Sequence, residues 1–357
     1  MKRVLLLTTY DYNSASSRIR HISLIPDLRD LGFDVSHHSF FDFHSLENRY
    51  ANKTLDFISV FKSYLKRARI IVRARRYDLI WVEKEIFPYF PVWLESLICR
   101  SAKTPIIVDM DDDWFAKYEE QIPRSCQSLF GKYHPVTAGN VSYSTSNESI
   151  FAKIRSFKIQ NSSFLLPPYI DLNLYPKVCV EHERKQLQEI KLGWIGSPLS
   201  SLHQLNPNMD LIKALASSFE VHLIGGHKSF EAIPNVFVHD WALHSEIEQM
   251  LKMDIAIMPL PNDYFTRGKS GYKAIQFMAL GIPVVASNLA NSSKVLGNGR
   301  GFVVETIEDW IRVVKQLASN HNLRNQMGLT GSNWVKEEYS RANFLACLLD
   351  IFEKKSN

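Results

Sequence analysis

A chain of 357 residues is too long for one ordinary hydrophobic core and therefore predicts two domains. Its hydrophobic content of 45% and charged content of 22% are globular values, which exclude an intrinsically disordered chain. The formal net charge of +5 is too small to indicate a nucleic-acid-binding protein, so we expect no nucleic-acid partner. It is compatible with an anionic substrate or an anionic membrane surface.

Cysteine usage and apolar runs predict a cytoplasmic protein. The four cysteines are scattered without a CxxC pair, which is typical of a reducing compartment. Residues 1–10 lack the apolar region and small-residue cleavage site of a signal peptide. No apolar run approaches the roughly 18 residues that a membrane span needs.

The first part of the chain alternates between strand and helix patterns. Residues 2–9 form a short apolar run, an amphipathic stretch follows over 19–31, and residues 33–40 resume as a strand. This βαβ pattern predicts a parallel sheet. Residues 77–84 and 104–111 predict further buried strands, with helical sequence around 87–102 between them.

A second alternating series begins after residue 185. Its expected strands are 190–196, 220–226, 235–241, 254–260 and 281–287, and helices are expected at 211–219 and 244–253. Two such series predict an α/β protein with two doubly wound parallel-sheet domains. We expect an N-terminal domain at 1–168, a linker at 169–186, a C-terminal domain at 187–335, and a last helix at 336–357 that is free to pack back on the N-terminal domain.

The loop at 261–273 is the richest candidate site. It carries three cations, Arg267, Lys269 and Lys273. Gly268 and Gly271 permit close backbone approach, and Ser270 would cap a helix starting near Gly271. Cations together with the amides of a helix start form an anion site, and three cations suit a diphosphate better than a carboxylate. The alternative is a solvated basic loop, which its position between two buried strands disfavours.

An acidic segment follows the strand at 104–111. Its carboxylates are Asp109, Asp111, Asp112 and Asp113. Three interpretations compete: a divalent-metal site, a haloacid-dehalogenase-like phosphotransfer motif using Asp109 and Asp111, and a polar strand end at an interdomain cleft. The phosphotransfer motif belongs in the first strand of a chain, whereas this segment follows a complete βαβ unit. We therefore favour the cleft.

Residues 61–78 form a strongly basic segment. Its cations are Lys62, Lys66, Arg67, Arg69, Arg73, Arg75 and Arg76, and its apolar residues include Phe61, Leu65, Ile70, Ile71 and Val72. A basic amphipathic segment indicates contact with anionic lipid headgroups. A solvated helix face remains the alternative.

Several segments, taken in order, resemble retaining GT-B glycosyltransferases of the family 4 type over essentially the whole chain. The matching segments are SRIRH (17–21), IIVDMDDDWF (106–115), WIGSP (194–198), RGKSGYKAIQFMALGIPVVAS (267–287) and GRGFVV (299–304). Each fragment alone is weakly specific, and their ordered spacing carries the resemblance. It implies two facing Rossmann-like domains with an interdomain cleft. The second domain would bind a nucleotide-sugar donor and the first an acceptor, with no cofactor and no essential metal.

The resemblance also implies roles for single residues. Lys269 and Lys273 would neutralise the diphosphate leaving group, and Gly271 and Tyr272 would offer backbone amides. Ser197 beside Gly196 would line the opposite wall of the donor site. Arg267 and Ser270, in the loop at 261–273, are counted among the donor-binding residues. Asp111 and Asp112 stand where the family often has a histidine and an aspartate, near the acceptor hydroxyl and sugar. Arg18, in the first loop, is a candidate to reach the cleft from the first domain, and a plain surface arginine is the alternative.

The donor loop departs from the family at two positions. The family usually carries two glutamates eight residues apart, and the corresponding residues here are Gly268 and Gln276. The Gln276 amide can still hydrogen-bond a ribose hydroxyl. Gly268 has no side chain with which to contact the sugar.

The function expected from the resemblance is sugar transfer from a nucleotide-sugar to a glycan or lipid-linked acceptor, as in cell-surface polysaccharide biosynthesis. The enzyme would be cytoplasmic, on the inner face of the membrane if residues 61–78 bind lipid. One alternative is a metal-dependent phosphotransferase or phosphatase using Asp109 and Asp111. Another is a non-catalytic nucleotide-sugar-binding subunit, which the missing glutamates suggest.

Overall fold

The computed structural model describes residues 1–41, 57–121, 135–157, 162–175, 189–289 and 291–356. The chain divides into two compact units. Unit 1 comprises Met1–Pro168 and Phe344–Asn357, and unit 2 comprises Tyr169–Asn343. Most of the linker expected at 169–186 lies outside the described residues.

Unit 1 is built on a six-stranded parallel sheet in the order β2-β1-β3-β4-β5-β6. Its strands are β1 (Lys2–Thr8), β2 (Phe33–Ser39), β3 (Leu79–Glu83), β4 (Ile106–Met110), β5 (Val141–Thr145) and β6 (Ser163–Leu165). Its helices are α1 (Ala15–Arg20), α2 (Ile25–Asp30), α4 (Phe57–Val72), α5 (Val92–Ala102), α6 (Trp114–Gln121) and α8 (Glu148–Ser156). Residues 4–7 of β1 are buried throughout, because a parallel sheet is covered by helices on both faces.

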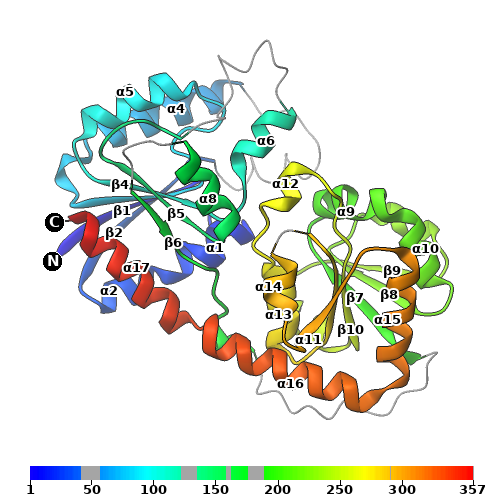
Figure 1. The fold of residues 1–357 in the computed structure, drawn as a ribbon. Coiled ribbons are helices and arrows are strands. Elements are labelled where there is room, and N and C mark those ends of the chain that lie inside the picture. Colours follow the sequence, from blue (N-terminus) through cyan, green and yellow to red (C-terminus); the bar gives the residue numbers. More distant parts are fainter. Residues whose placement is uncertain (42–56, 122–134, 158–161, 176–188, 290, 357) are drawn as a thin grey trace. The chain divides into compact units, whose positions relative to one another are not determined.

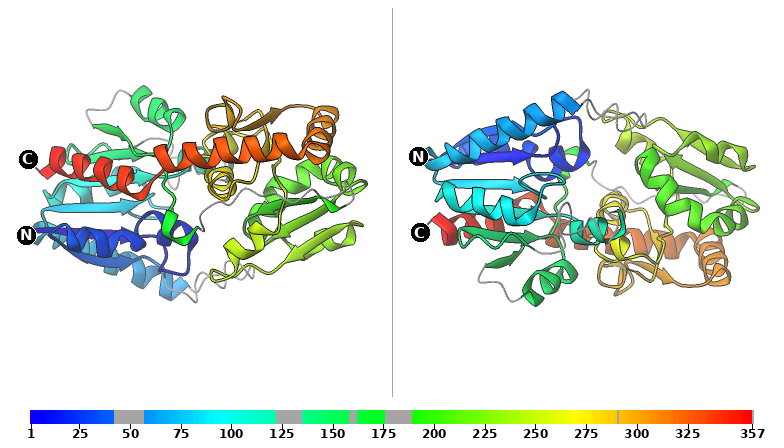
Figure 2. Two further views of the ribbon diagram at one scale, coloured as in Figure 1. Left: turned by 90° about the horizontal axis from the view of Figure 1, so that it is seen from below. Right: turned by 90° about the horizontal axis from the view of Figure 1, so that it is seen from above.

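The C-terminal helix α17 (Arg341–Ser356) contributes its residues from Phe344 onward to unit 1. Phe352 packs edge-on against Trp81 of β3, with ring centroids 5.7 Å apart, and also contacts Phe33 of β2. Figures 1 and 2 show α17 in red along this sheet. The end of the chain is therefore part of the core of unit 1.

Unit 2 repeats the architecture with a six-stranded parallel sheet in the order β12-β11-β10-β7-β8-β9. Its strands are β7 (Lys191–Ile195), β8 (Glu220–Ile224), β9 (Val236–His239), β10 (Ile255–Met258), β11 (Val284–Ser287) and β12 (Gly301–Val304). Its helices are α9 (Pro198–Leu205), α10 (Met209–Ala216), α11 (Glu246–Leu251), α12 (Tyr264–Arg267), α13 (Tyr272–Ala279), α14 (Ser292–Leu296), α15 (Ile307–Ser319) and α16 (His321–Glu338).

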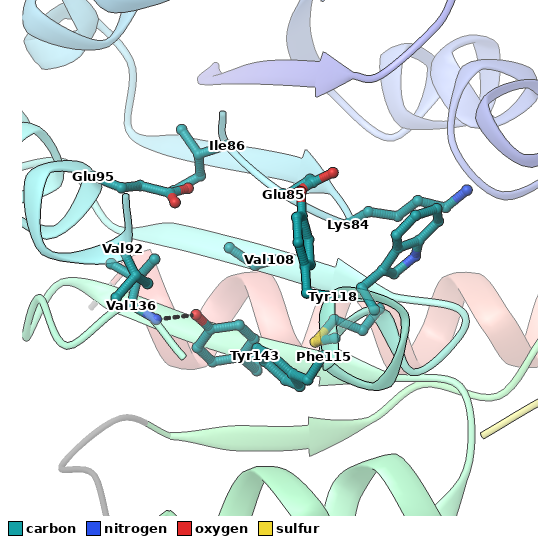
Figure 3. A pocket seen from close by; sticks show the side chains of 12 residues that line it. Lys84, Glu85, Ile86, Val92, Glu95, Val108, Phe115, Tyr118, Val136 and Tyr143 are labelled. Carbon is teal, nitrogen blue, oxygen red and sulfur yellow. Dashed lines mark hydrogen bonds between the residues drawn. The ribbon is translucent and has the colours of Figure 1, made fainter. Parts of the chain in front are cut away.

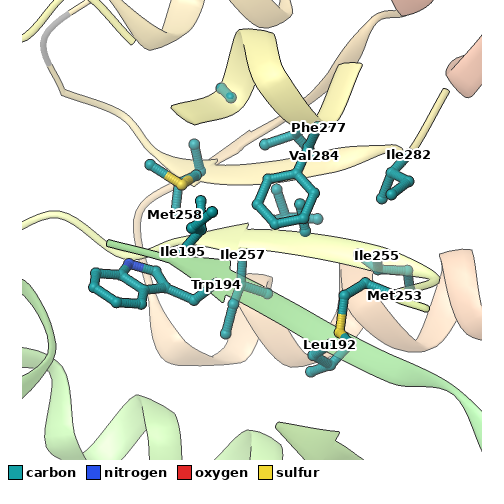
Figure 4. Packing of buried hydrophobic residues seen from close by; sticks show 14 of the residues in the cluster. Leu192, Trp194, Ile195, Met253, Ile255, Ile257, Met258, Phe277, Ile282 and Val284 are labelled. Carbon is teal, nitrogen blue, oxygen red and sulfur yellow. The ribbon is translucent and has the colours of Figure 1, made fainter. Parts of the chain in front are cut away.

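The core of unit 2 forms where β7, β10 and β11 meet the helices above them. Trp194, Ile257 and Phe277 are fully buried there, and Figure 4 shows them among the side chains packed around these strands. The sequence prediction of an α/β protein with two doubly wound parallel sheets is confirmed.

Candidate functional site

The candidate anion site lies at the switch point of the unit 2 sheet. From β7 the chain proceeds outward through β8 and β9, and then returns to place β10 on the other side of β7. Loops that leave adjacent strands in opposite directions open a crevice at their carboxyl ends, where ligands of such sheets bind. The loops after β7 and β10 contain the predicted residues at 196–197 and 267–273.

Gly196 and Lys273 are brought together at this crevice. A Cβ atom at position 196 would lie 2.6 Å from the Lys273 Nζ and 2.3 Å from Cη2 of Trp194. The ammonium lies 4.2 Å from the centroid of the Trp194 ring and 3.3 Å from Oε1 of Gln204. A methyl group at position 196 would therefore require the Trp194 ring and the Lys273 ammonium to move.

The start of α13 differs in one detail from the sequence prediction. Gly271, not Ser270, takes the N-cap position, at φ +83°, and no side chain caps the helix. The capping role predicted for Ser270 is wrong, because its hydroxyl lies one residue too early and is buried. Lys273 is in the first turn of α13, where backbone amides such as that of Tyr272 have no carbonyl upstream in the helix.

The other two cations of the loop make local contacts. The Arg267 guanidinium donates to the Asn262 side-chain oxygen, with Nη2 and Oδ1 2.8 Å apart, and is exposed. The Lys269 ammonium lies 4.4 Å from the Phe265 ring centroid. Lys273 is thus the predicted cation that the fold places directly beside Gly196.

Ser197 lies in the loop after β7, at the same crevice. Its side chain caps α9 by accepting a hydrogen bond from the Ser200 amide at 3.2 Å. From α9, the His203 imidazole reaches the Asp263 carboxylate, with Nε2 and Oδ2 3.1 Å apart. The loops after β7 and β10 therefore lie side by side.

Gln276 is buried one turn after Lys273 and contacts residues that the sequence analysis missed. Its amide nitrogen lies 2.8 Å from Oε1 of Glu246 and 3.3 Å from the Tyr175 hydroxyl. The other Glu246 oxygen accepts from the Trp241 indole nitrogen at 2.5 Å. Glu246 is the first residue of α11 and follows the loop after β9. Its position at the carboxyl edge of the sheet is the sequence feature that could have marked it as a candidate site residue.

In unit 1, the switch point lies between β1 and β3, and Glu83 ends β3 there. Its buried carboxylate accepts from the Thr9 amide at 2.9 Å and from the Ser17 hydroxyl at 2.6 Å. Burial alone would raise the pKa of Glu83, but the Lys84 ammonium and these hydrogen bonds hold it below its usual value. The buried glutamate anchors the loop after β1.

Lys84 links β3 to the acidic segment after β4, and the sequence analysis missed it. Its ammonium lies 3.3 Å from Glu83 and 3.5 Å from Asp111, and 4.9 Å from the centroid of the Trp114 ring. Burial alone would lower the pKa of Lys84, but Asp111 and Glu83 raise it. The sequence feature that could have identified Lys84 is the run of charged residues directly after an apolar strand.

Asp109 is a structural carboxylate. Arg20 binds it through two hydrogen bonds of 2.5 and 3.0 Å, His21 lies 3.2 Å away, and the Ser144 hydroxyl donates at 2.6 Å. Both of its oxygens are engaged, so it has little capacity left for a metal or a phosphoryl group. The geometry therefore disfavours a phosphotransferase that uses Asp109 and Asp111.

Of the remaining aspartates, Asp113 has a structural role, and Asp111 and Asp112 lie at the candidate site. Asp113 caps the start of α6 by accepting from the Ala116 amide at 3.1 Å, and it pairs with Lys153 at 2.8 Å. Asp111 accepts from the Trp114 indole at 3.4 Å, and burial raises its pKa. Asp112 follows it at the carboxyl edge of the sheet, partly exposed. Asp111 thus pairs with Lys84, as Glu83 does.

Arg18 is buried against the loop after β1. Its guanidinium donates to the Tyr12 carbonyl at 3.1 Å and lies 5.6 Å from the centroid of the Tyr12 ring. These contacts show it holding the loop.

A pocket opens beside Lys84 in unit 1 (Figure 3). Its wall includes apolar side chains from α5, β4 and α6, among them Val92, Val108 and Phe115. Tyr118 lies at the same pocket and donates to Glu85, with their oxygens 2.6 Å apart. This apolar hollow has room for about one water molecule, so it does not by itself define a ligand site.

Among the described residues, no group of three histidine, cysteine or acidic side chains is arranged to hold a metal ion. In the same parts of the chain, no helix is long and apolar enough to cross a membrane.

Comparison with solved structures assigns the chain to the GT-B class of fold. HepE of Anabaena, solved in complex with UDP and glucose, superposes with a TM-score of 0.68 at 13% identity over 100% of both chains. Sucrose-phosphate synthase of Thermosynechococcus elongatus gives 0.67 at 12% identity over 99% of both chains. A glycosyltransferase of Rickettsia africae ESF-5 gives 0.67 at 15% identity over 99% of this chain and 98% of its own.

Residues 191–320 match the family model described as glycosyl transferases group 1. No curated protein matches the chain in sequence. The matched range contains Gly196, Lys273, Gln276 and Glu246. The resemblance to GT-B glycosyltransferases of the family 4 type is confirmed.

Proposed function

We propose that this protein transfers a sugar from a nucleoside diphosphate sugar to an acceptor. The observation that carries the proposal is the Lys273 ammonium beside Gly196, in the first turn of α13 and at the switch point of the unit 2 sheet. A cation and helix-start amides at one crevice form a diphosphate site. The family match over 191–320 supports assigning this diphosphate to a sugar donor.

The proposed chemistry follows from the charge that develops when the donor breaks. The bond between the anomeric carbon and the phosphate oxygen lengthens, negative charge gathers on the diphosphate, and the sugar becomes oxocarbenium-like. A positioned cation stabilises that charge, and one such contact is commonly worth about 3–4 kcal/mol. Lys273 takes this role, with Lys269 and the amides of Gly271 and Tyr272 as further donors. Because lysines neutralise the leaving group, transfer needs no divalent metal.

Gln276 and Glu246 are assigned to the nucleoside. Their hydrogen bond places a carboxylate and an amide side by side one helical turn from Lys273. Both groups can accept hydroxyl donors, which suits the two hydroxyls of a ribose. Because Gly268 has no side chain, sugar recognition falls to residues other than the usual first glutamate.

The acceptor is assigned to unit 1, with Asp111 near its attacking hydroxyl and Asp112 and Arg18 at the same edge of the sheet. Lys84 holds Asp111 through the 3.5 Å ion pair. We propose a glycan or lipid-linked acceptor, a hexosyl or related donor sugar, and retention of configuration, within cell-surface polysaccharide biosynthesis.

The deciding experiment has two stages. Isothermal titration with a panel of nucleoside diphosphates is expected to give micromolar or tighter binding for at least one base. Transfer from the corresponding nucleotide-sugar to oligosaccharide and polyprenyl-linked acceptors is then measured with and without a chelator, and product configuration is read by NMR. Absence of binding to every nucleoside diphosphate refutes the proposal. Binding without transfer or donor hydrolysis indicates a non-catalytic subunit, and chelator-sensitive phosphate release indicates a phosphotransferase.

A further inference from the structure

Helices α4 and α5 of unit 1 expose large apolar side chains on neighbouring surfaces. Trp93 of α5 is 57% exposed and Phe61 of α4 is 53% exposed. The full set comprises Ile58, Phe61, Leu65 and Val72 on α4, Trp93 and Leu97 on α5, and Tyr89 in the connection before α5. The two helices pack against each other and lie adjacent in both Figures 1 and 2. Tyr64 of α4 also contacts Phe90, just before α5 begins.

The spacing puts these side chains on one face of each helix. Positions 58, 61, 65 and 72 are three, four and seven residues apart, which forms a single stripe along α4. Positions 93 and 97 do the same on α5. The opposite side of α4 is buried, with Arg67 and Ile71 facing the core. The apolar stripes are therefore outward faces and not parts of the core.

A row of cations runs beside the apolar stripe. Lys62, Lys66, Arg69 and Arg73 are all exposed and repeat at four, three and four residues. Arg100 is exposed on α5. The sequence from Phe57 to Val72 contains no acidic residue, and Glu95, the one acidic residue of α5, is buried. The face is thus apolar and uniformly positive.

The structure revises the basic segment predicted at 61–78. Arg67 does not belong to the exposed face, because its guanidinium is buried and donates to the Thr8 carbonyl at 2.8 Å. Ile71 is fully buried, and Ile70 is half-buried. Trp93 and Leu97, which lie outside the predicted segment, belong to the face instead.

We propose that this α4–α5 face binds the surface of an anionic lipid bilayer. The apolar side chains would enter the boundary between headgroups and acyl chains, while the lysines and arginines contact lipid phosphates. Tryptophan at such a boundary has an apolar ring and a polar nitrogen that suit both sides. A second copy of the chain fits this face less well, because a two-fold interface would bring two cation rows together. The inference goes beyond the reaction and does not depend on it.

Vesicle sedimentation tests the inference with the full chain. Vesicles of phosphatidylcholine are compared with vesicles that also contain phosphatidylglycerol, at low and high salt. We expect the protein to sediment with the anionic vesicles at low salt and to be released as salt rises. The double variant Trp93→Ser/Leu97→Ser and the double variant Lys62→Glu/Arg69→Glu should each lower the partition coefficient by about tenfold or more.

Matched controls come from α16 of unit 2. Leu329 is 46% exposed, compared with 52% for Leu97, and Lys336 is exposed. The Leu329→Ser and Lys336→Glu variants should sediment with anionic vesicles to the same extent as the wild-type protein. Circular dichroism and nucleoside diphosphate binding are measured on every variant to verify that it is folded. Loss of lipid binding can then be distinguished from failure of the proposed reaction.

Three results overturn the inference. The first is an unchanged protein that stays in the supernatant with anionic vesicles at low salt. The second is sedimentation of both α4–α5 variants at the level of the controls. The third is a wild-type protein that is a dimer by light scattering while the Trp93→Ser/Leu97→Ser variant is a monomer. A second copy of the chain, and not a lipid surface, would then cover the α4–α5 face.

Discussion

The Gln276 side-chain amide donates a hydrogen bond to the Glu246 carboxylate, with Nε2 and Oε1 2.8 Å apart. The glutamine comes from α13 and the glutamate from the start of α11. This pair puts a negative charge next to a position where the family usually has a glutamate of its own. In this chain a different element carries the carboxylate.

Glu246→Gln is expected to weaken nucleoside diphosphate binding by about tenfold or more, because a hydrogen bond to a charged group is commonly worth about 1.5–3 kcal/mol. The unchanged protein should prefer a ribonucleoside diphosphate to its 2′-deoxy analogue, and the variant should lose much of that preference. Calorimetric titration measures both. Inorganic pyrophosphate, which lacks the ribose, should bind the two proteins equally.

Glu248→Gln is the matched control for this prediction. Glu248 lies on the same helix, is exposed, and pairs with Lys252 at 2.9 Å. This variant should bind nucleoside diphosphates normally. Equal loss in the two glutamate variants would show that α11 as a whole had been disturbed and would contradict the role given to Glu246.

Lys273→Ala is expected to lower kcat by about a hundredfold or more at saturating donor, because a cation that stabilises the departing diphosphate is lost. Lys273→Met keeps an apolar stem against Trp194 and should lose as much activity, which separates charge from packing. Lys315→Ala, at an exposed lysine of α15, should behave as the unchanged enzyme. Near-normal turnover of both Lys273 variants would refute the assignment.

Gly196→Ala should weaken diphosphate binding by at least about tenfold. The new methyl group would lie 2.3 Å from Trp194 and 2.6 Å from the Lys273 Nζ, so the ring and the ammonium must move. Overpacking of this kind commonly costs about 1–3 kcal/mol of folding stability, which denaturant unfolding measures. Gly139→Ala is the control, since a Cβ atom at Gly139 has no neighbour within 4 Å.

Asp111→Asn should lower kcat by about tenfold or more while nucleoside diphosphate binding is unchanged, because Asp111 belongs to unit 1. Burial raises the pKa of Asp111, so its charge is lost at a higher pH than that of an ordinary aspartate. The acidic limb of the pH–rate profile should therefore flatten in the variant. An identical acidic limb in both proteins would argue against Asp111.

Asp109→Asn should destabilise unit 1 by about 3–5 kcal/mol at neutral pH, because the buried Arg20 guanidinium loses its carboxylate partner. Burial alone would raise the pKa of Asp109, but Arg20 and His21 hold it well below its usual value. The ion pair therefore stabilises the fold above the unfolded-state pKa of about 3.9 and loses effect as pH falls below it. Unfolding curves at several pH values should show that the difference in free energy of unfolding between the wild-type protein and the variant becomes smaller in acid. A gap that does not depend on pH would contradict this account.

Much of the fold was predictable from the sequence. Runs such as Val4–Leu7 are apolar at every position because strands of a parallel sheet are buried on both faces. Alternation with helical patterns then fixes parallel order, and loops at the carboxyl ends of strands become candidate sites. The cations at Lys269 and Lys273 were found in this way.

The residues that complete the sites required the tertiary structure. Sequence periodicity shows which face of an element is buried, but it does not show which side chain of another element meets that face. The partner of Asp109 is Arg20, which lies 89 positions away, and the partner of Gln276 is Glu246, 30 positions away. Packing also turned Arg67 inward, away from the exposed cations beside it. Sequence patterns alone predict the parallel strands and the loop that carries the cations, because burial and turn chemistry are local. Only the tertiary structure placed Lys273 against Gly196 and joined α4 and α5 into one positive, apolar face, because those contacts depend on how separate elements pack.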